Sequence, residues 1–343
     1  MSNARQPEAE LTTAGRMIFL RHRPPARPVL FALTALLASA CGSASGSTSG
    51  STSGTAATSA PEPASHGPRY ATTVTSSGPI NPAAIPLGDG YVSTSPRVGY
   101  VDSCVTSFPA LGGASVVGPW IDTATKTWDS LTKVAVEGSV RWLQARFTVT
   151  VSGDRRIITG NDLPIDHGTG IFPIRTSDPA YAYDRNPNTI TAQSISWPLP
   201  LDPVAAKTPS CLGLGPVGVL DDGVYLFDAL DGEGRDAAAH EVLDGSCQEH
   251  PEMAGVLHHH TVPSCLRSQA TGRSTLVGYA ADGYGIYVER SATGALLTNT
   301  GLDACHGRTS KVLWNGSEQV IYHYDATLEY PYTVGCYHGT PIS

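Results

Sequence analysis

Short stretches that alternate hydrophobic and polar residues, separated by turn residues, recur along the chain after residue 138. Between residues 146 and 151, Phe and Val alternate with Thr, and the turn-forming sequence Ser-Gly-Asp follows at 152–154. Side chains two positions apart lie on the same face of a strand, so this pattern is typical of a half-buried strand. It predicts a β-hairpin within residues 139–160, followed by a polar loop over 161–173.

Helical periodicity is rare. Two segments, 122–131 and 236–243, each predict one short helix. The chain has 36 Gly and 26 Pro, and only 15% of its residues are charged, which favours many turns between short strands. We therefore expect a mainly β fold, an antiparallel sandwich or a barrel-like domain, with few short helices.

An internal duplication organises the C-terminal part of the chain. Residues 218–227 match residues 278–287, and both have the pattern strand, Asp-Gly turn, strand. Two further landmarks recur afterwards in the same order. The first is a Leu-Asp pair that precedes a Cys, and the second is a His-containing strand that precedes another Cys. Since several landmarks recur in one order, we expect two copies of one β-rich unit, 211–270 and 271–343, related by pseudo-two-fold symmetry.

The N-terminal segment predicts export. Three arginines between residues 21 and 27 precede an apolar run that ends at Ala40, and this run is shorter than the roughly 20 residues that span a bilayer. We interpret residues 1–40 as a signal peptide. The sequence Ala38-Ser39-Ala40-Cys41 resembles the bacterial lipoprotein signal, which implies cleavage before Cys41 and a lipid on that cysteine. The alternative is an ordinary signal peptide with an incidental cysteine.

The remaining chain divides by composition. Residues 41–66 are rich in Ser, Gly, Thr and Ala, so we expect a flexible linker between the lipid and the folded part. Residues 67–145 form an N-terminal β-rich segment in this interpretation, and residues 146–343 form the domain that contains the duplication. The predicted location is the cell envelope, outside the cytoplasm and attached to the membrane through Cys41.

The net charge limits the kinds of binding partner, and the number of cysteines indicates the compartment. A formal net charge of −8 opposes nucleic-acid binding, and no protein partner is indicated. Six cysteines remain after Cys41, an even number that in an exported chain predicts three disulfides, with 15 formal connectivities. In each copy two cysteines bracket the His strand, which motivates the pairing Cys247–Cys265, Cys305–Cys336 and Cys104–Cys211.

A His-rich strand in each copy is the candidate site. His258 and His260 share one face of a strand, as do His323 and Asp325. If the two strands face each other across the pseudo-symmetry axis, three imidazoles and one carboxylate converge, a ligand set suited to copper or zinc. His250 is a further expected ligand, and the secondary candidates are His240 and His167. The alternative is that these side chains only form hydrogen bonds in the core.

The same region resembles the YHYH domain family, named for a Tyr-His-Tyr-His strand. The resemblance runs from about residue 161 to 341 and includes Tyr322-His323-Tyr324 and the segments 163–167, 183–188, 234–244, 277–287 and 329–336. The first copy keeps both His positions but has Leu257 and His259 in place of Tyr. The second has Asp325 in place of the last His. The resemblance implies a secreted or surface-anchored protein and carries no established activity.

Three hypotheses follow for the function. The first is an extracytoplasmic lipoprotein domain that binds a transition metal through the His/Asp cluster. The second is an envelope hydrolase in which this cluster activates water, with or without a metal. The third is a non-catalytic adhesion or ligand-binding module, in which disulfides and His serve only the fold.

Overall fold

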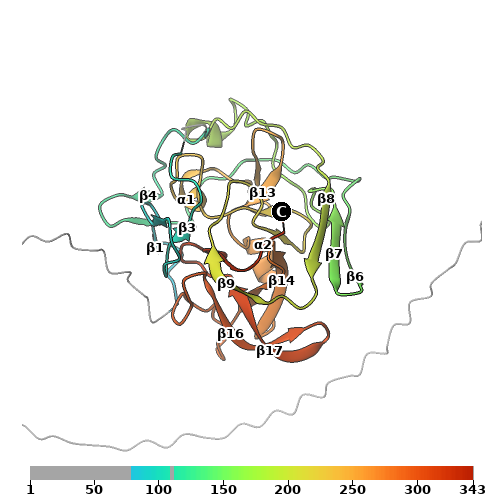
Figure 1. Cartoon of the computed structure of the whole chain (residues 1–343). Helices are drawn as coiled ribbons and strands as arrows, with labels where there is room; N and C mark the ends of the chain where they lie inside the picture. The colour runs from blue at the N-terminus through green and yellow to red at the C-terminus, as the bar shows by residue number, and fades with distance from the viewer. Residues whose placement is uncertain (1–78, 109–111, 343) are drawn as a thin grey trace, which may run out of the picture. The chain divides into compact units, whose positions relative to one another are not determined.

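An eight-stranded sheet is the largest element of the computed structural model, which describes residues 79–108 and 112–342 (Figure 1). Its strands are rich in β-branched and aromatic residues, which favour a pleated, half-buried surface. Their order across the sheet is β12-β13-β11-β10-β14-β15-β17-β16. In chain order the strands are β10 Gly218–Leu220, β11 Tyr225–Leu226, β12 His250–Pro251, β13 Leu257–His259, β14 Ser274–Ala280, β15 Gly285–Glu289, β16 Gly307–Trp314 and β17 Ser317–Asp325.

The strand order is symmetric about the antiparallel pair β10–β14. On each side a hairpin, β10–β11 or β14–β15, pairs in parallel with a His-containing strand, β13 or β17. That strand pairs in antiparallel fashion with an outer strand, β12 or β16. The strand order therefore confirms the predicted duplication, and both copies contribute to one sheet.

The two hairpins turn at the Asp-Gly pairs that defined the repeat. Gly223 and Gly283 have φ angles of +90° and +93°, which glycine adopts without steric cost. The Oδ1 atom of Asp222 accepts a hydrogen bond from the Val224 N–H at 3.0 Å, and Asp282 accepts one from the Tyr284 N–H at 3.3 Å. These local bonds stabilise both turns in the same way.

Gly278 lies at the seam between the two copies, opposite Leu220. A Cβ atom at Gly278 would lie 2.5 Å from the Val219 carbonyl oxygen and 2.9 Å from the Leu220 Cα. Backbone atoms cannot move aside as a side chain can, so we expect Gly278→Ala to lower the free energy of unfolding by about 1–3 kcal/mol. Denaturant unfolding measures this. Gly213→Ala tests whether loss of a glycine alone is responsible, because nothing lies within 4 Å of a Cβ there and its φ angle is not positive.

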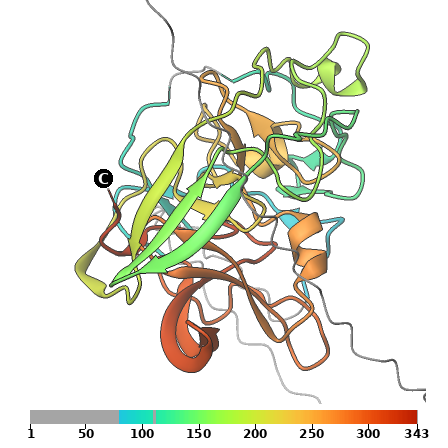
Figure 2. The same cartoon turned by 90° about the vertical axis from the view of Figure 1, so that its right-hand side faces the viewer.

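A second sheet packs on one face of the large sheet. It has the order β6-β7-β8 and comprises Phe147–Ser152, Arg155–Gly160 and Ile195–Pro200. Ile158 and Leu199 from this sheet share a buried cluster with Val219 and Trp314 from the large sheet. Figure 2 shows the three strands side by side. The mainly β prediction and the hairpin prediction are confirmed. The barrel-like form is not adopted, since the large sheet has two edges, β12 and β16.

The remaining elements are short. Strands β1, β4 and β5 form a three-stranded sheet, β2 pairs with β3, and β9 pairs with β18. Their bounds, with those of the helices, are β1 Ile85–Pro86, β2 Val92–Ser93, β3 Val101–Asp102, β4 Ile121–Asp122, β5 Thr127–Trp128, β9 Ala205–Ser210, β18 Tyr337–Gly339, α1 Ala237–His240, α2 Ser264–Gln269 and the 3-10 helix Pro179–Ala182.

One helix prediction is wrong. Residues 122–131 contain no helix: a tight turn at 123–126 joins β4 to β5, and a further turn follows β5. The Asp122 Oδ1 atom accepts hydrogen bonds from the N–H groups of Ala124 and Thr125 at 2.8 and 3.2 Å, and Lys126 has a φ of +54°. Such side-chain bonds compete with helical ones. Residues 236–243 do contain the short helix α1.

The three disulfides have the predicted pairing. Their Cα–Cα distances are 5.1 Å for Cys104–Cys211, 5.4 Å for Cys247–Cys265 and 4.4 Å for Cys305–Cys336. The predicted signal peptide, Cys41 and the linker lie outside the described residues. Within the described part of the chain, no helix has the length and apolar character needed to cross a membrane.

Candidate metal centre

Three buried imidazoles converge at one end of the large sheet. His258 lies on β13 and His260 directly follows that strand, so both side chains lie on one face. His250 on the edge strand β12 is the register partner of His258. The ring centroids are 4.4 Å apart for His250 and His258, and 4.9 Å apart for His258 and His260. The structure thus brings together three of the five predicted metal ligands.

Hydrogen bonds donated by Nδ1 orient two of these rings. The His258 Nδ1 atom donates to the Val256 carbonyl at 3.2 Å, and the His260 Nδ1 atom donates to the Asp228 carbonyl at 2.5 Å. A proton on Nδ1 leaves the Nε2 lone pair for another partner, as in many metal-binding histidines. The Nε2 atoms of His250 and His260 are 3.2 Å apart. His250 and His260 therefore direct their Nε2 atoms toward each other, and a ring nitrogen of His258 lies within 4.8 Å of the group.

Glu241 lies beside this group and is a further candidate ligand that the sequence pattern did not predict. Its Oε2 atom lies 3.2 Å from the His250 Nε2 and 3.1 Å from the His260 Nε2. Helix α1 ends at His240, and extended backbone at Glu241 directs this side chain into the cluster. No spacing rule links Glu241 to a strand that begins at Leu257, so only the tertiary structure could identify it.

The protonation states of two of the three rings suit a cation site, whereas for His260 burial lowers the pKa but Glu241 raises it above its ordinary value. Burial lowers the pKa of His250 to about 4 and holds the pKa of His258 well below its ordinary value. These two rings are neutral at physiological pH, as metal coordination requires. Burial by itself would raise the pKa of Glu241. His250 and His260 lower it by a larger amount, and the resulting pKa is about 2. The carboxylate is therefore ionised.

The spacing fits a tetrahedral ion. In a tetrahedral site, Zn–N and Zn–O bonds of about 2.0–2.2 Å imply distances of about 3.3–3.6 Å between neighbouring ligand atoms. The distances from Glu241 to His250 and His260, 3.2 and 3.1 Å, are slightly shorter than this range. Ligand atoms of His250, His258 and His260 all lie within 4.8 Å of one another. The three imidazoles could therefore hold zinc or copper, with the Glu241 carboxylate beside two of them.

His323 and Asp325 do not join this group, which corrects the prediction of one shared cluster. They lie on β17, and four strands, β11, β10, β14 and β15, separate β17 from β13. A strand spacing of about 4.8 Å places the two His strands roughly 24 Å apart. The copies pair through β10 and β14, so their His strands lie far from the axis. With Glu289, His323 and Asp325 form a separate compact group.

The two secondary candidates also lie elsewhere. The Nε2 atom of His240 is 2.9 Å from the Asp89 carboxylate. His167 contacts Asp166 at 2.7 Å and Glu249 at 3.2 Å. Both imidazoles therefore have acidic partners outside the metal cluster, and their positions favour a structural role.

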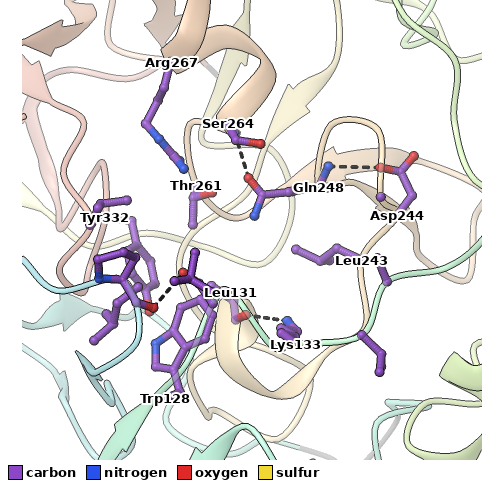
Figure 3. Close-up of a pocket in the computed structure, with 18 of the residues that line it drawn as sticks. Trp128, Leu131, Lys133, Leu243, Asp244, Gln248, Thr261, Ser264, Arg267 and Tyr332 are labelled. Carbon is purple, nitrogen blue, oxygen red and sulfur yellow. Dashed lines mark hydrogen bonds between the residues drawn. The ribbon is translucent and has the colours of Figure 1, made fainter.

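A cavity of about 380 Å³ is lined by residues that neighbour the His cluster in sequence (Figure 3). Thr261, which follows His260, lines it together with Trp128, Lys133, Arg267 and Tyr332. The Lys133 Nζ atom donates to the carbonyl oxygens of Ala238 and Glu241, each at 2.5 Å. Burial lowers the pKa of Lys133 to about 8. Lys133 thus contacts both the cavity and the backbone of Glu241, whose side chain lies in the His cluster.

The fold and the site define a disulfide-bonded, mainly β domain with a duplicated sheet and a buried His cluster. Residues 196–301 match the model of the family described as YHYH protein, which confirms the resemblance over this range. The matched segment contains Glu241, His250, His258 and His260 and ends before β16. No curated protein and no solved structure matches the chain.

Proposed function

We propose that this protein binds one divalent transition-metal ion, zinc or copper, through His250, His258, His260 and Glu241. The convergence of three buried imidazoles and one ionised carboxylate carries the proposal. Such nitrogen and oxygen donors suit both metals. We further propose that the protein acts outside the cytoplasm on a lipid anchor at Cys41, where it sequesters or carries the ion.

The contacts favour an ion over a purely structural role for these histidines. Among the described residues, the Oε2 atom of Glu241 is buried and has no hydrogen-bond partner. This oxygen lies 3.2 Å from the His250 Nε2 atom and 3.1 Å from the His260 Nε2 atom. Buried polar groups normally have partners, because an unsatisfied one costs about 1–3 kcal/mol. An ion between His250, His260 and Glu241 would supply that partner.

Binding is favoured over hydrolysis by the number of donors. Catalytic zinc sites usually have three protein ligands and a water in the fourth position, whereas closed sites have four protein ligands. The three imidazoles supply three donors, and Glu241, which lies beside two of them, supplies a fourth. The three disulfides support an oxidising compartment outside the cytoplasm.

Metal analysis of the purified protein tests this proposal. After treatment with a chelator and titration with Zn²⁺ or Cu²⁺, we expect one ion per chain. Bound metal should raise the thermal unfolding temperature, since a ligand at 100 times its Kd stabilises the folded state by about 2.7 kcal/mol. Calorimetry and thermal unfolding give both quantities. An absence of binding for both metals in the folded protein would rule the proposal out.

Glu241→Gln tests the carboxylate separately. We expect this variant to bind Zn²⁺ about 10–100-fold more weakly, because it removes the negative charge while keeping the side-chain shape. Glu318→Gln is a matched control, since Glu318 is exposed and pairs with Lys311. Titration calorimetry compares both with the unchanged protein. Equal affinities for all three would show that Glu241 is not a ligand.

A further inference from the structure

The second copy contains a cluster that is built like the metal centre. His323 on β17 corresponds to His258 on β13. The His323 Nδ1 atom donates to the Ile321 carbonyl at 3.1 Å, as the His258 Nδ1 atom donates to the Val256 carbonyl at 3.2 Å. In both copies, therefore, the backbone two residues earlier holds the ring with Nε2 directed into a cluster.

The neighbouring position follows the same plan. The His259 Nε2 atom is 3.0 Å from the Oδ2 atom of Asp222, and the Tyr324 hydroxyl donates to the Oδ2 atom of Asp282 at 2.6 Å. Both aspartates belong to the Asp-Gly turns of the duplicated hairpins. The two His strands are thus attached to equivalent turns by equivalent bonds, although one uses an imidazole and the other a phenol.

The outer strands differ in one decisive residue. His250 on β12 is the register partner of His258, and Arg308 on β16 is the register partner of His323. Arg308 therefore occupies in the second copy the position of a proposed metal ligand in the first. Likewise, Asp325 occupies the position of His260.

The Arg308 guanidinium lies where a cation would be held. Its Nη2 atom is 2.6 Å from a Glu289 carboxylate oxygen, and its Nε atom is 2.7 Å from an Asp325 oxygen. The His323 side chain is fully buried, and its Nε2 atom is 3.6 Å from Glu289 and 3.8 Å from Asp325. In the described part of the chain, this Nε2 atom has no hydrogen-bond partner. Two carboxylates and an imidazole thus surround one built-in positive charge.

We infer that the second cluster is a metal-type site whose cation is the Arg308 guanidinium, so that this site is closed to metal in the natural chain. Two carboxylate groups face the single positive charge of the guanidinium. A divalent ion in its place would neutralise both, and buried charges require such compensation. An imidazole at position 308 would supply the ligand that His250 supplies in the first copy. The count of one ion per natural chain rests on the proposed function, but the second site can be tested alone.

The test places Arg308→His in a chain that already carries His258→Ala and His260→Ala. We expect this triple variant to bind one Zn²⁺ per chain, measured by titration calorimetry, and its Co²⁺ form to show the visible absorption of a tetrahedral site. The parent double variant should bind none. Arg308→Lys in the same background is the matched control, because it keeps a positive charge without adding a ligand, and it should also bind none.

The outcomes separate the two proposals. A folded triple variant that binds no more Zn²⁺ than the Arg308→Lys control overturns the inference, as does a parent double variant that still binds Zn²⁺ at His323. If the natural chain binds no metal and the triple variant binds one ion, the proposed function fails and the inference stands. If Arg308→His unfolds the chain without metal, the inference requires Zn²⁺ to restore the fold. A chain that stays unfolded with Zn²⁺ while the Arg308→Lys control folds overturns it equally.

Discussion

Replacing His258 and His260 together by alanine should abolish metal binding. Both side chains contribute an Nε2 atom to the cluster, and only His250 and Glu241 would remain. Loss of a residue that merely supports a ligand typically costs about 10–100-fold in metal affinity, so loss of two direct ligands should cost more than about 100-fold. Titration of the chelator-treated variant with Zn²⁺ or Cu²⁺ measures the effect as a loss of the single expected binding event.

His323→Ala provides the matched control for this experiment. It removes an equally buried histidine from the equivalent strand of the other copy. We expect it to keep the affinity and the stoichiometry of the natural chain, because its cluster already holds Arg308. Unchanged uptake by the His258→Ala, His260→Ala variant would discard the proposed ligands. A loss of binding in both variants would instead indicate damage to the shared sheet.

Removal of the Cys104–Cys211 disulfide should cause the largest loss of stability. This bond joins residues 107 positions apart and ties the N-terminal segment to the strand-rich part of the chain. Closing a loop of about 100 residues lowers the entropy of the unfolded chain enough to stabilise the fold by about 4.7 kcal/mol. Denaturant unfolding of the Cys104→Ala, Cys211→Ala variant under non-oxidising handling measures this difference.

The Cys247–Cys265 bond is an internal comparison for this prediction. Its loop has a sequence separation of 18, for which the same relation gives about 3 kcal/mol. Removing it should therefore cost roughly 1.5 kcal/mol less than removing the long-range bond. If the short-range variant is the less stable of the two, loop entropy is not the main contribution, and local packing around Cys247 decides the result.

The departures from the Tyr-His-Tyr-His motif follow the two faces of a strand. Positions 258 and 260 direct side chains into the metal cluster, whereas positions 257 and 259 lie on the opposite face. Leu257 is fully buried, and His259 pairs with Asp222. The exchange of both Tyr residues in the first copy therefore changes the packing face and leaves the ligand face unchanged. In the second copy, Asp325 is a change on the ligand face itself.

The sequence by itself determined the features that depend on short-range pattern. Alternating residues predicted the hairpin β6–β7, and recurring landmarks predicted both the duplication and the disulfide pairing. The period of two also placed His258 and His260 on one face. Each of these follows from spacing along the chain, because strand geometry and the bracketing cysteines are local properties.

The tertiary structure alone decided which ligands meet. The two copies could pair through their His strands or through β10 and β14. The choice depends on packing between residues that are distant in sequence, and the structure shows pairing through β10 and β14. That arrangement separates His323 and Asp325 from the first cluster. Glu241 enters the metal centre from the end of a helix, and Arg308 enters the second cluster from an edge strand. No local period encodes either contact, since both depend on strand order and register.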